Sequence, residues 1–298
     1  MRNLIIDGGN LLHRTYYTAN KKPVLNKFKM NVGHVYWFLS KIKELQEDHK
    51  CDNIFVAWDI RDKDFVNFRQ SAVDYKGSRD RTKDVDVHKF DEIIWKACES
   101  LGMRCFRANK LEADDIISWI CSDHMSSADE NIVVSSDQDF IQLLHLHSNT
   151  NIYSMSKYTM LTAGNITEFT NGVKACHHLL FKAVMGDDSD NINGLFRYGK
   201  VKSAKFVKDF RVNYDNLNKD DQEVVLRNIR IMDLREGMRV YPDEVEFYRD
   251  QIKEPTVNMT KFFEICNRLD LSRISKMKSI WRRTFDTNTK DDLLSLLL

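Results

Sequence analysis

The chain has 298 residues, 42% of them hydrophobic and 30% charged, with a formal net charge of +1. This composition is typical of a folded enzyme with one large domain, or a main domain and a smaller one, and it excludes wholesale disorder. No apolar run approaches the roughly 20 residues of a membrane span, and Asp7 interrupts the first apolar run, which argues against a signal peptide. Six cysteines without a C-x-x-C pair argue against a zinc site and favour buried free thiols. We therefore expect a cytoplasmic protein that crosses no membrane.

Short β-rich runs alternate with amphipathic stretches in the first half of the chain. The predicted strands are Leu4–Asp7, Ile54–Asp59, Met103–Arg107 and Ile132–Ser135. The predicted helices, where apolar residues recur with a helical period, are Val32–Leu45, Phe90–Leu101 and Ala113–Cys121. Strands that alternate with helices predict an α/β fold with a mostly parallel central sheet flanked by helices. In such sheets, ligands bind beyond the carboxyl ends of the strands.

The remaining segments divide the chain into two parts. Arg61–Asp86 is rich in charge and poor in aliphatic residues, which indicates a mobile loop or arch. From Val173 the pattern becomes helical, so we expect a core over residues 1–172 and a helical part over residues 173–298. Residues 215–298 contain no motif that we can interpret. The tail DDLLSLLL is either a packed terminal helix or a docking site for a replication protein.

Acidic residues recur at the ends of the predicted strands and in one loop. Asp7 and Asp59 end two strands, where an aspartate is also common as a turn former or a helix cap. The other acids lie in three motifs, EADD (Glu112, Asp114, Asp115), SSDQDF (Asp137, Asp139) and MGDDSDN (Asp187, Asp188, Asp190).

Each motif has a simpler interpretation. The acids of EADD would interact favourably with the dipole of the helix that follows, as ordinary residues of a helix N-terminus do. Three negative charges so close, however, repel one another unless a cation lies between them. The acidic loop at Asp187–Asp190 could be a solvated turn, whereas the calcium-binding hand motif lacks its glycine and terminal glutamate here.

Together the five segments make a stronger case than any one of them. Strand ends converge at one sheet edge, where carboxylates select Mg²⁺ or Mn²⁺ over zinc. Two such ions about 4 Å apart can activate water and stabilise the leaving oxygen of a phosphodiester. If nine acids belong to this site, 35 of the 44 acids remain against 45 bases, a balance of +10 that suits a nucleic-acid substrate.

These motifs resemble those of the 5′ nucleases, which comprise flap endonucleases, the 5′-nuclease domain of bacterial DNA polymerase I and phage enzymes, including the RNase H type of T-even phages. The resemblance spans roughly residues 3–235 and rests on IIDGGNLLHR, VAWD, DYKGSRD, EADD, SSDQDF and MGDDSDNI, in order and at family-like spacing.

The resemblance implies roles for individual residues. The implied metal ligands are Asp7, Asp59, Glu112, Asp114, Asp115, Asp137, Asp139, Asp187 and Asp190. Arg14 and Lys76 are implied to contact the scissile phosphate. Tyr75 is expected to stack on a base, and Arg79 and Arg81 to line the passage through an arch near residues 61–110. For each basic residue, an ordinary solvated surface charge is the alternative.

The chain departs from the family pattern after MGDDSDNING. The family continues G-V-x-G-I-G-x-K-x-A, which forms a helix-loop-helix clamp on the duplex backbone. This chain reads GLFRYGKVKSA instead. Arg197 replaces the first glycine of the G-x-G pair, and one residue is inserted before Ala204. We expect the clamp near residues 181–211, with Lys200, Lys202 and Lys205 on the duplex, and Arg197 in place of the usual monovalent cation.

The sequence thus predicts a monomeric enzyme that hydrolyses phosphodiester bonds with two or more Mg²⁺ ions, for which Mn²⁺ substitutes. The expected substrates are 5′ ends, flaps and RNA–DNA primers of replication, in the host cytoplasm if the protein is viral. One alternative is a PIN-type ribonuclease, which would be about half this length and lack DYKGSRD. Another is a non-catalytic binder of branched DNA, which would not need so many repelling carboxylates.

Overall fold

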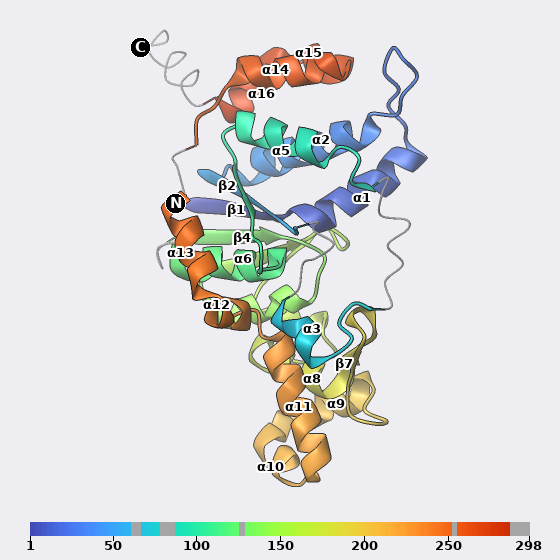
Figure 1. The fold of residues 1–298 in the computed structure, drawn as a ribbon, viewed down its shortest axis with the longest axis vertical. Coiled ribbons are helices and arrows are strands. Elements are labelled where there is room, and N and C mark those ends of the chain that lie inside the picture. The colour runs from blue at the N-terminus through green and yellow to red at the C-terminus, as the bar shows by residue number, and fades with distance from the viewer. Residues whose placement is uncertain (61–66, 78–86, 125–128, 252–254, 287–298) are drawn as a thin grey trace. The chain divides into compact units, whose positions relative to one another are not determined.

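The computed structural model describes residues 1–60, 67–77, 87–124, 129–251 and 255–286 (Figure 1). The chain divides into two compact units. Unit 1 comprises Met1–Trp58, Arg81–Phe106 and Gln251–Leu298, and unit 2 comprises Asp59–Asp80 and Arg107–Asp250. Among the described residues, no helix is both long enough and apolar enough to span a bilayer.

Unit 1 has parallel strands covered by helices. Strand β1 (Arg2–Asp7) pairs with β2 (Asn53–Trp58) in parallel register, with Asp7 opposite Ala57, and β3 (Arg104–Arg107) lies beside β2. Its described helices are α1 (Gly8–Lys21), α2 (Gly33–His49), α5 (Asp91–Ser100), α14 (Met259–Arg268), α15 (Ser272–Ser275) and α16 (Lys278–Phe285).

The sequence of unit 1 explains its layers. Leu4, Ile5 and Ile6 of β1 are completely buried, as expected for a strand covered on both faces. Helices α2 and α5 lie between the strands and the C-terminal helices (Figure 1). There Trp281 of α16 packs against Phe262 of α14, with ring centroids 5.1 Å apart. The C-terminal helices, which contain no recognisable motif, therefore complete the core of unit 1.

Unit 2 contains the other strands and most of the short helices. Strand β4 (Glu130–Val134) runs parallel to β5 (Thr150–Ser154), β6 (Thr159–Leu161) runs antiparallel to β5, and β7 (Gly186–Asp187) forms a short antiparallel ladder with β8 (Ile192–Asn193). Its α-helices are α3 (Phe68–Ala72), α6 (Ala113–Trp119), α7 (Leu143–Leu146), α8 (His178–Met185), α9 (Lys200–Phe206), α10 (Phe210–Asp215), α11 (Lys219–Met232), α12 (Glu236–Val240) and α13 (Pro242–Gln251).

Short helical turns and a hydrophobic cluster complete unit 2. Helix α6 continues as a π-helical turn, Ile120–His124, and 3-10 turns cover Asp139–Gln142, Ile166–Glu168, Ala175–His177, Asp188–Asp190 and Val207–Asp209. Phe181 of α8, Phe206 of α9 and Val225 of α11 belong to one buried cluster. This cluster holds together the helical end of the unit, where α8 lies beside α11 (Figure 1).

The fold class predicted from the sequence, mostly parallel strands flanked by helices, is confirmed. All four predicted strands and all three predicted helices are present, whereas β5 and β6 were not predicted. Helix α3 lies within the expected loop Arg61–Asp86; residues 61–66 and 78–86 and the tail 287–298 lie outside the described residues. The cysteine prediction holds for Cys51, Cys98, Cys121 and Cys266, but Cys105 is half-buried and Cys176 is exposed.

Candidate metal centre

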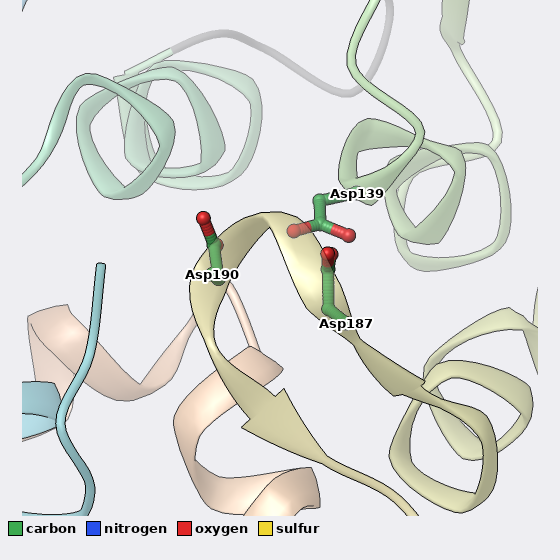
Figure 2. Close-up of side chains that lie close together, drawn as sticks. All are labelled: Asp139, Asp187 and Asp190. Atoms are coloured by element: carbon green, nitrogen blue, oxygen red, sulfur yellow. The ribbon is translucent and has the colours of Figure 1, made fainter. Parts of the chain in front are cut away.

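Three aspartates from two motifs meet in unit 2. Oxygen atoms of Asp139, Asp187 and Asp190 all lie within 4.8 Å of one another. Figure 2 shows the carboxylates of Asp139 and Asp187 facing each other, with Asp190 on the same turn as Asp187. Oxygen atoms at this spacing can share one divalent cation.

The local backbone explains why Asp187 and Asp190 are so close. Gly186 has a φ of 82°, and a Cβ there would lie 2.6 Å from the carbonyl oxygen of Ile192, so the turn requires glycine. Oδ1 of Asp187 accepts a hydrogen bond of 2.9 Å from the backbone N–H of Ser189, which caps the following 3-10 turn. The motif MGDDSDN therefore forms a tight turn that presents both carboxylates to one point.

A pocket of unit 2 gathers further acids around this cluster. It is lined by Glu112, Asp114, Asp139, Asp187 and Asp190, five of the nine acids that the sequence suggested. The described lining contains no cysteine or histidine. A donor set made of carboxylate oxygens fits a hard divalent cation such as Mg²⁺ or Mn²⁺.

Glu112 is the most enclosed acid of this pocket, with 8% of its surface exposed. It begins α6 and accepts hydrogen bonds from Lys76 Nζ at 2.6 Å and Tyr75 Oη at 3.0 Å, while Arg69 Nη1 lies 3.3 Å from its second oxygen. Burial alone would raise the pKa of Glu112, but the charges of Lys76 and Arg69 outweigh it and hold that pKa below its ordinary value. Glu112 is thus kept ionised, as a metal ligand must be.

The motif DYKG is hydrogen-bonded to the turn that contains Asp190. Tyr75 Oη lies within hydrogen-bond distance of Asp190 Oδ2 at 3.3 Å, and the backbone N–H of Lys76 donates to the carbonyl of Asp190 at 3.0 Å. Lys76 has a φ of 55°, a left-handed conformation that aims its side chain at Glu112. Tyr75 is 8% exposed, so the structure places its ring in the interior rather than on a stacking surface.

Asp114 and Asp115 lie side by side in sequence but have different environments. Asp114 lines the acidic pocket. Asp115 has no exposed surface, and its two oxygens accept hydrogen bonds of 2.8 and 2.6 Å from Arg69. Oδ2 of Asp115 also accepts from the backbone N–H of Glu112 at 3.1 Å. The carboxylate of Asp115 therefore faces Arg69, and this differs from the metal-ligand role that the motif suggested.

Asp59 and Asp137 accept hydrogen bonds from the backbone of the EADD and SSDQDF motifs, respectively. Oδ1 of Asp59 accepts from the backbone N–H of Ala113 at 2.8 Å, at the start of α6. Oδ1 of Asp137 accepts from the backbone N–H of Asp139 at 2.9 Å. Desolvation of its carboxylate and then the charge of Asp139 raise the pKa of Asp137 to about 6, although the residue as a whole is exposed. Carboxylates this close repel one another, and a cation would relieve that repulsion.

Lys182 is a site residue that sequence reasoning missed. Its ammonium group donates to Asp187 Oδ2 at 2.6 Å and to Asp139 Oδ1, and only 6% of the residue is exposed. Burial would lower the pKa of Lys182, but the two carboxylates hold it above its ordinary value. In the sequence it resembles any helical lysine, and the one available signal was its place five residues before Asp187.

The basic residues expected on DNA are exposed in unit 2. Lys200, Lys202 and Lys205 lie on α9. Arg197, on the preceding loop, has a φ of 63°, and its guanidinium lies 5.0 Å from the ring of the exposed Phe196. The arginine thus keeps the left-handed backbone that a glycine would adopt. A side chain with a Cβ rarely adopts this backbone, so the loop holds Arg197 in a conformation that glycine would adopt more easily.

Four other predicted residues lie outside the described part of unit 2. Asp7 and Arg14 belong to unit 1, where Asp7 caps α1 by accepting from the backbone N–H of Asn10 at 2.9 Å. Arg79 and Arg81 lie outside the described residues.

Comparison with known proteins identifies the family. The family model described as "5'-3' exonuclease, N-terminal resolvase-like domain" matches residues 2–171. A protein named 5'-3' exonuclease from Buchnera aphidicola subsp. Schizaphis graminum is 28% identical over 235 residues, which cover 76% of this chain and 77% of that protein. DNA polymerase I of Streptococcus pneumoniae is 28% identical over 212 residues, covering 68% of this chain but only 23% of the polymerase.

Solved structures of 5′-exonucleases and flap endonucleases have the same fold as this chain. The T5 5'-exonuclease with bound divalent metal ions (zinc) superposes with a TM-score of 0.69 at 21% identity, covering 84% of this chain and 98% of the T5 chain. Flap endonuclease-1 from Methanococcus jannaschii superposes with a TM-score of 0.59 at 15% identity, covering 96% and 93%. Because the family model matches more than half of the residues, this chain belongs to the 5′-3′ exonuclease family.

Proposed function

We propose that this chain is a divalent-metal-dependent 5′ nuclease that hydrolyses phosphodiester bonds near the 5′ end of flapped or nicked DNA and of RNA–DNA primers. The observation that carries the proposal is the pocket in which five acids from three motifs converge, beside a lysine fixed on Glu112. The solved T5 relative with bound divalent metal ions supports it.

The ligands that we propose for the metals are Asp7, Asp59, Glu112, Asp114, Asp137, Asp139, Asp187 and Asp190, with Asp115 assigned to positioning through Arg69. Two or more Mg²⁺ ions, for which Mn²⁺ substitutes, would activate the attacking water and stabilise the leaving oxygen. Among the groups of this chain, Lys76 and Arg14 would hold the scissile phosphate and stabilise its developing charge.

The remaining residues are proposed to bind nucleic acid. We propose residues 1–172 as the nuclease core, with the arch near 61–110, where Arg79 and Arg81 would line the path of the 5′ strand. Residues 173–298 would form the helical part, of which α14, α15 and α16 pack into unit 1. In this part Lys200, Lys202 and Lys205 of α9 are exposed and suited to phosphate contacts. We further propose that the enzyme is monomeric, acts in the cytoplasm during replication, and contacts a replication protein through its C-terminal region.

Cleavage of a 5′-labelled flap substrate, with Mg²⁺ and with EDTA, tests the proposal. We expect metal-dependent cleavage by the wild-type chain and almost none by Asp139→Asn, because Asp139 belongs to the three-aspartate cluster. Asp139→Asn should still bind the flap and should keep its thermal stability, since it removes one of several repelling charges while Lys182 stays paired with Asp187 at 2.6 Å.

Two results would overturn the proposal. Tight flap binding without cleavage at any Mg²⁺ concentration would indicate a non-catalytic binder of branched DNA. Cleavage of single-stranded RNA with no preference for a 5′ flap would indicate a PIN-type ribonuclease.

A further inference from the structure

A buried lysine occupies the place between two of the proposed metal ligands. Lys182 is 6% exposed, and its ammonium group bonds one oxygen of Asp139 and one of Asp187. Lysine is rarely buried to this extent unless its charge is paired. Here the partners are two of the three aspartates whose oxygens lie within 4.8 Å of one another.

Both carboxylate oxygens of Asp187 accept hydrogen bonds from the chain. Oδ2 of Asp187 is bonded by Lys182, and Oδ1 is bonded by the backbone N–H of Ser189 at 2.9 Å and by its hydroxyl at 2.6 Å. Both oxygens are therefore occupied by donors from the chain. A cation that binds Asp187 directly has to share or displace one of these donors.

The charge balance leads to the same conclusion. The three aspartates bring three negative charges together, and Lys182 returns one positive charge at hydrogen-bond distance. Without it, Asp139 and Asp187 would repel each other in a partly desolvated site. With it, the carboxylates are held together before any metal ion arrives, but their attraction for the ion is weaker.

We propose that Lys182 is an internal counter-ion of the metal centre, a positioning residue that keeps Asp139 and Asp187 assembled in the metal-free enzyme and yields its place when a divalent cation binds. This inference rests on the proposed function, because it assumes that the aspartate cluster binds metal. It assigns to the lysine two opposite effects, a gain in metal-free stability and a loss in metal affinity.

Metal binding without DNA tests both effects. MnCl₂ is titrated calorimetrically into EDTA-stripped wild type, Lys182→Met, Lys182→Arg and Lys208→Met, and each protein is melted in EDTA and in saturating Mn²⁺. Lys182→Met should bind Mn²⁺ at least about tenfold more tightly, which is about 1.4 kcal/mol, since removing a unit charge a few ångströms away changes the attraction by more than this at an intermediate dielectric. Its melting temperature should fall in EDTA and recover in Mn²⁺.

Lys182→Arg and Lys208→Met test whether the effect depends on the charge of Lys182 and on its position in the site. Lys182→Arg keeps the charge and should stay near wild type in affinity. Lys208→Met removes the same charge from an exposed position outside the pocket and should change neither quantity. Unchanged Mn²⁺ affinity in Lys182→Met, with equal loss of melting temperature in EDTA and in Mn²⁺, would overturn the inference and leave Lys182 a purely structural residue.

Two further outcomes are distinguishable. If Lys182→Met does not fold, the double variant Lys182→Met, Asp139→Asn tests whether repulsion between the carboxylates is the cause. Removing one carboxylate should then restore folding. A double variant that also fails to fold would contradict the inference. If the wild-type chain itself bound no Mn²⁺, the proposed function would fail, whereas wild-type binding with an unaffected variant would reject the role of Lys182 alone.

Discussion

The guanidinium of Arg69 binds the carboxylate of Asp115 through two hydrogen bonds of 2.8 and 2.6 Å, and neither residue exposes more than 3% of its surface. Arg69 Nε also donates to the carbonyl of Ile231 at 3.0 Å. One arginine thus joins three elements of unit 2, namely α3, α6 and α11. This pair fixes the start of α6, where Glu112 is located, against the segment that contains Tyr75 and Lys76.

We expect Arg69→Met to lower the free energy of unfolding by about 3–5 kcal/mol, because it leaves the carboxylate of Asp115 buried without its partner. Urea unfolding measures the loss. Arg230→Met is the control, since the side chain of Arg230 is 68% exposed and its pairing with Glu236 at 3.1 Å is a surface contact worth about 1 kcal/mol or less. Similar small losses in both variants would show that the buried pair does not hold these elements together.

Lys76→Ala should slow single-turnover cleavage by about a hundredfold or more and change flap binding little. The backbone of Lys76 is held by Asp190 and its ammonium group by Glu112 at 2.6 Å, so its charge is in place before substrate binds. A charge that acts mainly in the transition state lowers turnover more than affinity. Lys174→Ala, at an exposed position, is the matched control. If saturating enzyme restored the rate of Lys76→Ala, the lysine would be only a phosphate anchor.

Arg197→Ala should weaken duplex binding and flatten the plot of log affinity against log salt by about 0.9, the contribution of one phosphate contact. The left-handed backbone at φ 63° makes a second variant informative. Arg197→Gly suits that backbone and removes the same charge, so it should show the same flattened slope and equal or higher stability than Arg197→Ala. Fluorescence titrations across salt concentrations measure the slope. Slopes equal to wild type in both variants would show that the side chain does not touch the DNA backbone.

His34 should make the protein less stable in mild acid. The residue is 3% exposed and its Nε2 lies 2.9 Å from the carbonyl oxygen of Leu12. Burial lowers the pKa of His34 from 6.5 to about 4, partly opposed by that hydrogen bond and by Asp91 and lowered further by His88 and His13. Because the unfolded chain binds the proton first, the stability present above pH 6.5 is lost as the pH falls toward 4.

The loss expected from His34 over that range is about 3 kcal/mol, at 1.36 kcal/mol per pKa unit. In His34→Gln, the fall in unfolding free energy between pH 6.5 and 4 should be smaller by this amount. Urea unfolding at several pH values measures it, with the exposed His145→Gln as the control. An unchanged pH profile in His34→Gln would mean that burial does not lower the pKa of this histidine below its value in the unfolded chain.

The positions of the acids could be predicted from the sequence because each depends on its own neighbours. Asp7 ends an apolar run, and that run forms the buried strand β1. Glu112 precedes an apolar helical stretch, and it caps α6. The strand β5 was missed because TNIYS alternates buried and half-buried residues over only five positions, too few to separate from a loop.

The strand–helix order, the acidic motifs and their family could be predicted from the sequence, since these depend on local periodicity and on spacing. The role of each charge could not, because it depends on tertiary contacts. In the sequence, Arg69 and Lys182 look like solvated basic residues, yet both are buried. Arg69 binds Asp115, 46 positions along the chain, and Lys182 binds Asp139, 43 positions away. A charge can be buried only where the fold brings an opposite charge to it, and that meeting depends on packing between segments distant along the chain.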